Sequence, residues 1–322
     1  MKKNNLLLII FIYTSKFLLA QDPEFSQFYA NPLYLNPALT GTSQKLENAA
    51  GRATLNYRNQ WQGSYRTWCA GWDQGFDKVH GGFGAQIVHD AMADGLIQSS
   101  EIRGFYSYHM NLGKEENQLY AGLQLSYGNR FIDFSRLKFG SQVVPGVGFI
   151  DSGMAGGMSD AISYPNAAFG LVFSNTKITF GAAIHNLLEP NISFYQSPNE
   201  VIPKRYTVHF GYHFQEEGWG LSAKPQLLFM QQRNFSQAVI GSSFNFKNIQ
   251  AGLWYRQTFG QYRNADAVIF SAGYMSDHIQ FLYSYDMTVS DGRSAIPSSH
   301  ELSLAYRWKT KQKRHSTGKM FF

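Results

Sequence analysis

The chain has 322 residues, of which 44% are hydrophobic, 16% aromatic and only 16% charged, and its formal net charge is +6. Its single cysteine, Cys69, excludes an internal disulfide, and no cysteine stands near the N-terminus to carry a lipid anchor. Beyond residue 20 no apolar run approaches the roughly 20 residues of a spanning helix, so the aromatic-rich, Gly-rich composition leaves an exported β-sandwich or a membrane β-barrel.

Residues 1–20 have the outline of a secretory signal peptide. Lys2 and Lys3 precede the apolar run Leu6–Tyr13, and the small residue Ala20 ends the segment. A membrane anchor is the alternative, but Thr14–Lys16 interrupt a run that is already shorter than the roughly 20 apolar residues a spanning helix needs. We therefore expect cleavage after Ala20 and export of the mature chain.

Residues 21–50 form an irregular segment rich in proline and aromatic side chains. Two Asn-Pro pairs deny it helix and strand continuity, and the aromatic residues between Asp22 and Gly41 provide apolar surface that needs burial. We expect the segment to start in the periplasm and to act as a plug inside the domain that follows, the alternative being contact with a periplasmic partner. The candidate residues are Phe25, Phe28, Tyr29, Asn31, Pro32, Tyr34, Asn36 and Pro37.

Residues 51–308 show the alternation of a membrane β-barrel. In Arg205–Gln215 one face carries only apolar and aromatic residues, whereas the other carries polar residues and glycine. Asn248–Thr258 and His278–Met287 repeat this pattern. Polar faces made of Gly, Gln, Ser and Thr are typical of strands that face lipid on one side and a polar lumen on the other. The predicted fold is therefore all-β, a transmembrane antiparallel β-barrel of the outer membrane.

About fourteen such runs are present, each near the roughly 9–11 residues of a tilted spanning strand. An even count places both ends of the barrel in the periplasm. The turns after even-numbered strands are short, whereas the long connections 131–165, 189–203, 257–264 and 290–298 all follow odd-numbered strands, as outer loops do. The strands are expected to begin near Ala53, Thr67, Gly82, Leu96, Gln118, Asn166, Lys177, Lys204, Leu221, Ser236, Asn248, Ala265, His278 and Ser299.

The polar parity of the strands predicts which side chains line the lumen. Two of them, His209 and His213, share a face but lie about 13 Å apart along a strand, which is too far to hold one metal ion. We expect neither a metal nor a cofactor site and no nucleic-acid partner. The predicted lumen-lining residues are Arg205, His209, His213, Arg256, Asp286 and Glu301.

A hydrolase would need a serine, a histidine and an acid that converge in space. His89-Asp90 and His300-Glu301 are candidates, but adjacent residues of a strand point to opposite faces and no Gly-x-Ser-x-Gly elbow occurs. We interpret Asp90 and Asp94-Gly95 as parts of an outer turn, and Arg58 as a strand end beside an interfacial aromatic. No catalytic residue is predicted.

The opening QDPEFSQFYANPLYLNPALTG, residues 21–41, resembles the start of the PorP/SprF family, outer-membrane barrels of the type IX secretion and gliding machinery. Further similar landmarks stand in the family's order and extend over nearly the whole mature chain. They are YRNQW (57–61), D90-x-x-x-D94-G95, PNAAFG (165–170), GAAIHNLLEP (181–190), PKRYTVHFGYHF (203–214), KPQLLF (224–229), AGLWYR (251–256), YSYDM (283–287) and SSHELSLAYRW (298–308).

The resemblance implies binding rather than chemistry. Members of the family export or hold surface proteins that bear the second type of C-terminal secretion signal, such as gliding adhesins, and some contact periplasmic parts of the secretion apparatus. We therefore expect an outer-membrane anchor whose outer loops or lumen grip the signal domain of such a protein. A passive porin with an open lumen and an outer-membrane hydrolase are the alternatives.

Residues 309–322 form a basic tail that the family pattern usually lacks. A short charged end after the last strand is typically solvated and irregular. We expect such a tail in the periplasm, the alternative being contact with peptidoglycan or an acidic partner.

Overall fold

The computed structural model describes residues 22–47, 49–61, 63–113, 116–137, 143–144, 148–149, 160–194, 200–215, 220–260, 266–289 and 298–309. The predicted signal peptide and the basic tail from residue 310 lie outside these residues. Within them, no helix has the length and apolar character needed to cross a membrane.

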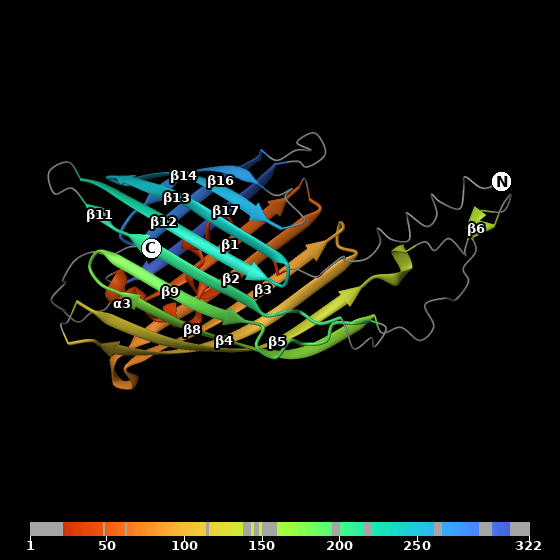
Figure 1. Cartoon of the computed structure of the whole chain (residues 1–322), viewed down its shortest axis with the longest axis horizontal. Coiled ribbons are helices and arrows are strands. Elements are labelled where there is room, and N and C mark those ends of the chain that lie inside the picture. The colour runs from red at the N-terminus through yellow and green to blue at the C-terminus, as the bar shows by residue number, and fades with distance from the viewer. Residues whose placement is uncertain are drawn as a thin grey trace.

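Strands dominate the described part of the chain (Figure 1). The strands of the barrel are β1 (Gly51–Gln60), β2 (Tyr65–Phe76), β3 (Gly81–Met92), β4 (Ile97–Asn111), β5 (Gln118–Ile132), β8 (Ala161–Ser174), β9 (Ile178–His185), β10 (Arg205–Tyr212), β12 (Leu221–Gln232), β13 (Phe235–Phe246), β14 (Ile249–Phe259), β15 (Ala267–Met275), β16 (Ile279–Thr288) and β17 (Ser299–Trp308).

The remaining elements are short. Four of them lie in the N-terminal segment, where they are single helical turns: η1 (Phe28–Ala30), α2 (Pro32–Leu35), η2 (Pro37–Leu39) and α3 (Ser43–Leu46). The others lie in connections or extend a strand: η3 (Asp77–Val79), η4 (Phe134–Arg136), β6 (Val143–Val144), β7 (Gly148–Phe149) and β11 (Phe214–Gln215), which continues β10.

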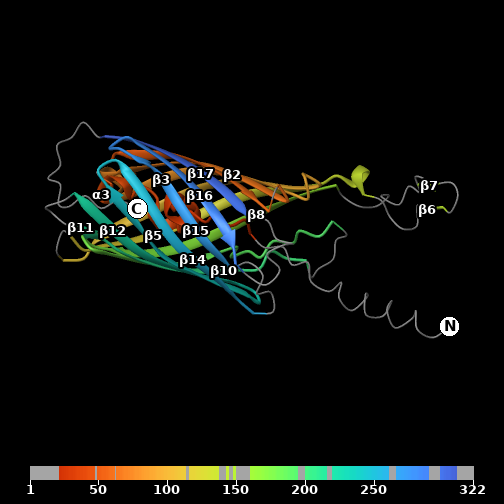
Figure 2. The ribbon, with the colours of Figure 1, turned by 90° about the horizontal axis from the view of Figure 1, so that it is seen from above.

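The strands close into one antiparallel barrel of 14 strands (Figures 1 and 2). Each strand pairs with its neighbours in chain order, the first and last strands β1 and β17 pair along nine residues, and β10 pairs with β12. The sequence-based fold class is therefore confirmed. The expected strand starts agree with the observed ones to within two residues, except at β8.

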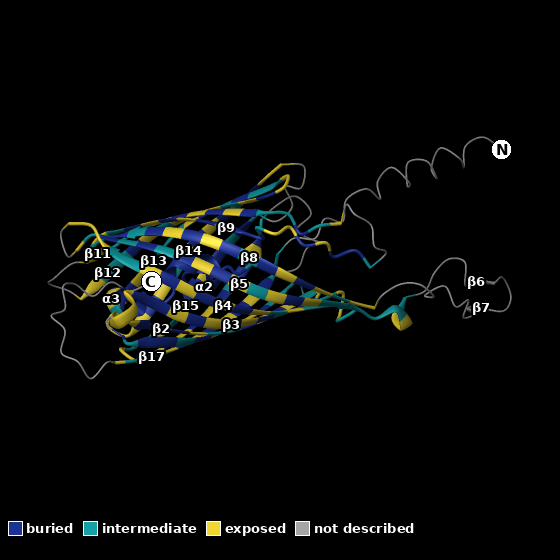
Figure 3. Cartoon of the chain, turned by 90° about the horizontal axis from the view of Figure 1, so that it is seen from below, coloured by how far each residue is buried: buried dark blue, intermediate teal, exposed yellow. Residues whose placement is uncertain are grey.

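Burial alternates from residue to residue along the strands, as the sequence predicts (Figure 3). In β10, Arg205, Thr207 and His209 are buried, whereas Tyr206, Val208 and Phe210 are exposed. The exposed set includes most of the large aromatic and aliphatic side chains of the strands. Such an outer surface is suited to lipid, and the polar inner surface to a filled or wet lumen.

All the long connections lie at one end of the barrel. A turn of two residues joins β13 to β14, and Asn175–Lys177 join β8 to β9. The connections after β5, β9, β14 and β16 are long. This segregation agrees with the sequence-based prediction. We call the end with the long connections the outer end and the opposite end the periplasmic end.

The structure differs from the sequence-based expectation in two places near the outer end. β8 begins at Ala161, not at Asn166, because its first residues already pair with β5. Pairing of β8 with β9 starts only at Phe169. Pro165 therefore sits where one side of β8 needs no backbone donor. Asp90 was expected in a turn, but β3 continues to Met92 and Asp90 is buried on its inner face.

Candidate functional site in the lumen

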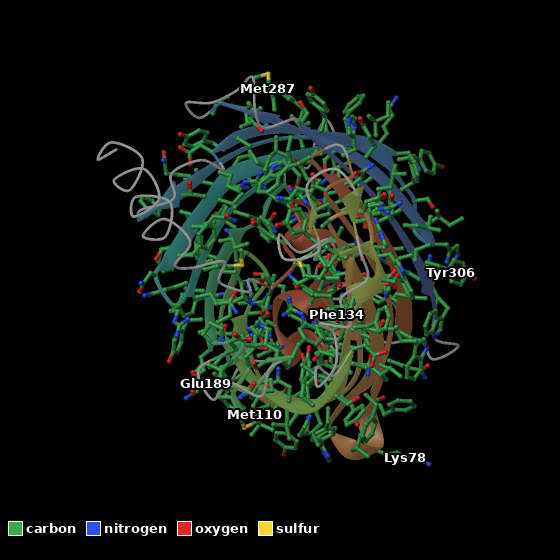
Figure 4. The ribbon with its side chains drawn as sticks, turned by 90° about the vertical axis from the view of Figure 1, so that its right-hand side faces the viewer. Lys78, Met110, Phe134, Glu189, Met287 and Tyr306 are labelled. Carbon is green, nitrogen blue, oxygen red and sulfur yellow. The ribbon has the colours of Figure 1, made fainter. Side chains whose placement is uncertain are left out.

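The N-terminal segment, Asp22–Glu47, lies inside the barrel and is surrounded by the strands (Figure 4). Asp22 contacts Arg205 and Gln232, at the outer ends of β10 and β12. Glu47 contacts Arg52 and Arg307, at the periplasmic ends of β1 and β17. The segment thus runs from the outer end to the periplasmic end, and the expectation that it starts in the periplasm is wrong for the described residues.

At the outer end, two arginines hold the segment. Asp22 forms an ion pair with Arg205 at 3.2 Å, and its carboxylate accepts a hydrogen bond from Asn186 at 2.8 Å. The guanidinium groups of Arg103 and Arg205 both lie over the ring of Tyr34, at 4.9 and 5.0 Å from the ring centroid. Cation–π contacts of this kind strengthen when they are removed from water.

In the middle of the lumen, the segment binds a charge-balanced cluster of the wall. We call Arg58, Arg256, Asp286 and Glu301 the wall cluster. Arg58 pairs with Asp286 at 2.9 Å and with Glu301 at 3.0 Å, and Arg256 pairs with Asp286 at 3.1 Å. The backbone N–H of Ser26 donates to the Glu301 carboxylate at 2.7 Å, and the Ser26 hydroxyl donates to Asp286 at 2.5 Å.

Beside the wall cluster, aromatic side chains of the segment fill the lumen. The ring of Tyr29 stacks on Trp254 with centroids 4.9 Å apart, and Phe28 meets Trp254 edge-on at 5.5 Å. Trp254 is 1% exposed although it lies on the polar-parity face of β14. Its inward position places it in an apolar part of the inner wall, where Leu228, Val239, Ile269 and Leu282 are buried in the same cluster as Phe28 and Tyr29.

At the periplasmic end, Glu47 lies between two arginines of the wall. Arg52 donates to Glu47 at 2.5 Å and to Asp73 at 2.8 Å, and Arg307 donates to the other oxygen of Glu47. Burial alone would raise the pKa of the Glu47 carboxyl, but the charges of Arg307 and Arg52 outweigh it and lower that pKa to about 2. Asp73 also accepts the backbone N–H of Gly41 at 2.6 Å.

The pairing of Glu47 predicts an acid-sensitive step. Its folded-state pKa of about 2 lies below the usual 4.5, so its stabilisation is complete above pH 4.5 and is lost as the pH falls toward 2. We expect the free energy of unfolding in detergent to fall more steeply between pH 5 and pH 2.5 for the wild type than for Glu47→Gln. Urea titrations followed by tryptophan fluorescence measure this, and parallel pH profiles would contradict it.

The Asn-Pro pairs have a structural role that explains their irregular appearance. Pro32 and Pro37 begin the short helices α2 and η2, where the missing proline N–H costs no hydrogen bond. Asn36 accepts the N–H of Ala38 at 2.9 Å and donates to two wall carbonyls, those of Leu171 and Ala182, both at 3.2 Å. The amide therefore fixes the turn of the segment and joins it to β8 and β9.

Glycines of the wall leave room for the backbone of the segment. A Cβ on Gly122 would lie 2.2 Å from the backbone N of Ala38, and one on Gly170 would lie 2.0 Å from Oδ1 of Asn36. Neither position admits a side chain while the segment stays in place. The inner wall and the segment thus fit each other at backbone level.

We expect Gly122→Ala to displace the segment. The added methyl group overlaps the backbone of Ala38, and overpacking of this kind typically costs about 1–3 kcal/mol. The matched control is Gly211→Ala, also on the inner face, where the new Cβ lies 3.5 Å from Gln226 and meets ordinary contact. Conductance in a planar bilayer and protease sensitivity of the segment should rise for the first variant only; equal behaviour of the two would refute the fit.

All eight candidate residues of the segment are buried inside the barrel. Five of the six predicted lumen-lining residues are buried there as well, and four of them, Arg205, Arg256, Asp286 and Glu301, bind charges or polar groups of the segment. His209 contacts the amide of Asn36 at 3.3 Å. His213 lies near the periplasmic end, is partly exposed, and contacts Gln215 at 3.4 Å.

Sequence reasoning missed the arginines of β1. Arg58 was interpreted as a strand end, yet it is 1% exposed and points into the lumen. Arg52 and Arg58 are six residues apart on one strand, and this even spacing placed both on the inner face. Their shared parity along β1 was the sequence signal that both arginines face the lumen.

The residues considered for catalysis do not converge. His89 faces outward and contacts Ser100 at 2.9 Å, whereas Asp90 faces inward and accepts a hydrogen bond from Thr67 at 2.5 Å. Among the described residues, no group of three His, Cys, Asp or Glu side chains is arranged to hold a metal ion.

A cavity lies at the outer end of the lumen, and we call it the outer vestibule. It holds about 620 Å³ of empty space, including space open to solvent. Strands β3, β4, β5 and β8 line it on one side, and Asp22 and Pro23 of the N-terminal segment line it as well. Its residues include Asp90, Glu101, Arg103, Arg130 and Tyr164.

Comparisons with known proteins agree with the barrel. The family described as "Type IX secretion system membrane protein PorP/SprF" matches residues 18–306. The structure of the CymD monoaromatic hydrocarbon channel is 12% identical, covers 88% of this chain and 94% of its own, and has a TM-score of 0.52. The Acinetobacter baumannii outer membrane protein Omp33 is 6% identical, with coverages of 82% and 100% and a TM-score of 0.49. No curated protein matches. At such identities the CymD likeness shows the fold alone.

Proposed function

Because the chain belongs to the PorP/SprF family of type IX secretion system membrane proteins, we propose that it binds an exported surface protein and helps to export or anchor it. The partner would carry a C-terminal secretion signal domain of the second type, as gliding adhesins do. The family is one of secretion-system membrane barrels and not of enzymes, and we propose that this chain acts by binding alone.

The occupied lumen is the observation that carries this proposal. The N-terminal segment contacts the wall at the outer end, in the middle and at the periplasmic end, and its aromatic side chains are buried. A passive channel needs a continuous aqueous path, which this packing opposes. A barrel closed by its own chain is better suited to hold a partner than to pass a solute.

The outer end is the proposed binding region. The strands β5, β9, β14 and β16, which precede the long connections, end there, and the outer vestibule is lined by residues of β5 among others. Binding residues commonly lie on such connections because a rigid scaffold positions them. Contact between the periplasmic end and other parts of the secretion machinery is a further part of the proposal, supported by the family.

Affinity purification from the native outer membrane tests the proposal. The tagged barrel should retain an exported protein with a C-terminal signal domain, and the isolated domain should bind the purified barrel again. Conductance of the same preparation in a planar bilayer should be low. High conductance without capture of any exported protein would overturn the proposal in favour of a porin.

A further inference from the structure

Arg130 is the one arginine of the outer vestibule without a direct ion pair to a described side chain, and the charges of Asp90 and Glu200 act on it only from a distance. Asp22 is paired with Arg205 at 3.2 Å, and Glu101 is paired with Arg103 at 2.7 Å. Asp90 accepts the Thr67 hydroxyl at 2.5 Å. Arg130, in contrast, forms no hydrogen bond or ion pair with the part of the chain that the structure describes, and its Nε is buried without a partner.

Arg130 occupies a fixed position in the wall. In the register of the sheet it lies opposite Ile162 of β8, and Tyr164 stands two residues further along the same face. Diagonal neighbours of this kind are about 7–8 Å apart. Gly128, directly opposite Tyr164, allows the ring to lie against the wall, because a Cβ there would lie 2.6 Å from it.

The acidic groups of the vestibule leave one side of Arg130 open to an anion. Asp90 pairs with Ser99, and Ser99 pairs with Arg130, so Asp90 and Arg130 are two strands apart, or roughly 10 Å between backbones. Glu101, the other acid of this wall, is neutralised by Arg103. On the side of β8, Tyr164 and Ile162 pack against Ile192 and Ile202, so a negatively charged group reaches Arg130 from the vestibule that it lines.

We infer that the outer vestibule binds a carboxylate of an exported polypeptide, with the guanidinium of Arg130 as its counter-ion. Arginine forms two parallel hydrogen bonds to a carboxylate, and such bonds are about twice as strong as uncharged ones. A partly buried guanidinium without a partner gains most from such a ligand. A polypeptide supplies the carboxylate either at its C-terminus or on an Asp or Glu side chain.

The site is suited to retention and not to passage. Asp22 and Pro23 line the vestibule, and the rest of the N-terminal segment is packed in the lumen behind them, which opposes passage of a bound chain. This inference rests on the proposed function, since it names the chemical group by which the exported protein is held.

Calorimetric titration of the full-length barrel in nanodiscs tests the inference with defined peptides. The probes are an N-acetylated hexapeptide of Gly, Ser and Tyr with a free C-terminal carboxylate, its C-terminal amide, the same amide with one Glu, and acetate. We expect the peptide with the free C-terminal carboxylate to bind at least tenfold more tightly than its C-terminal amide. Arg130→Gln should remove this difference, and binding of the Glu-bearing amide identifies a side-chain carboxylate as a second acceptable source.

Arg66→Gln is the matched control, because Arg66 lies at the same end of the barrel but is exposed and paired with Asp94 at 2.8 Å. Arg66→Gln should bind the peptide with the free C-terminal carboxylate as the wild type does. Circular dichroism should show that both variants are folded. Equal binding of acid and amide to the wild type, or acetate binding as tightly as the peptide, would overturn the inference.

Capture from the native membrane separates this inference from the proposed function. If the wild type retains an exported protein and Arg130→Gln retains it equally well, the carboxylate site is wrong and the anchor remains. If the wild type retains no exported protein, the proposed function itself is wrong.

Discussion

Deletion of Asp22–Thr40 will raise the conductance of the purified barrel in a planar bilayer while the barrel stays folded. The deletion removes the part of the N-terminal segment that contacts β8, β9, β14 and the wall cluster, and it leaves Glu47 against Arg52 and Arg307. Water then replaces the segment along a polar inner wall, which opens an aqueous path.

The barrel survives this deletion because its closure does not depend on the segment. The ladders between β1 and β17 and between β10 and β12 close the ring. The wall cluster contains two positive and two negative groups that pair with each other, so none of its four charges loses its counter-ion. Arg205 loses Asp22 and becomes hydrated at the outer end. Polar groups of the wall that lose a partner become hydrated, which avoids the cost of a buried unsatisfied group.

A variant with a Gly/Ser linker of equal length in place of these residues is the control for chain length. It should conduct like the deletion, because a flexible polar chain does not fill the lumen. Circular dichroism and resistance to unfolding in SDS report the folded barrel. Unchanged conductance together with loss of a periplasmic partner would assign the segment to that contact instead.

Arg58→Met will produce the largest loss of stability of any single substitution that we propose. Arg58 is 1% exposed and is the only described side chain that pairs with both Asp286 and Glu301. Its removal leaves two buried carboxylates, of which Asp286 retains Arg256 and Glu301 retains no ion pair among the described residues. Removing one partner of a buried ion pair typically costs about 3–5 kcal/mol.

Urea unfolding of the purified barrel in detergent measures this loss. Arg66→Met is the control, because Arg66 and Asp94 form an exposed pair whose loss should cost about 0–1 kcal/mol. Adding Glu301→Gln to Arg58→Met should recover part of the stability, since it removes the uncompensated charge. A loss no larger than that of Arg66→Met would show that the wall cluster does not stabilise the barrel.

Much of the barrel was predictable because the physics of a membrane strand is local. Alternation with a period of two separates the lipid face from the lumen face within one strand, as in Arg205–Tyr212. Turn residues and connection lengths are also local, and they identified the outer end. Pro165 shows the limit of this reasoning, because only the pairing of β8 with a single neighbour explains its place in a strand.

The contacts of the lumen were not predictable, because they depend on register between distant strands. Arg58 of β1 meets Asp286 of β16 and Glu301 of β17, and nothing within any one strand selects these partners. The aromatic content of the N-terminal segment predicted that it needs burial, but not its direction. That direction follows from the acids near its two ends, Asp22 and Glu47, each of which meets arginine on the wall.

The contacts between the first and the last parts of the barrel have a consequence for its biogenesis. The N–H groups of Ser26 and Gln27 bind Glu301, from which they are 275 and 274 positions apart in the chain. Because β17 is the last strand of the barrel to be synthesised, these bonds form only after β17 has met β1. Until then the aromatic side chains of residues 25–34 stay exposed, which is the kind of surface that periplasmic chaperones and proteases recognise. An unfinished barrel therefore exposes aromatic residues that quality-control factors can bind. Pairing of β1 with β17 allows these residues to be buried.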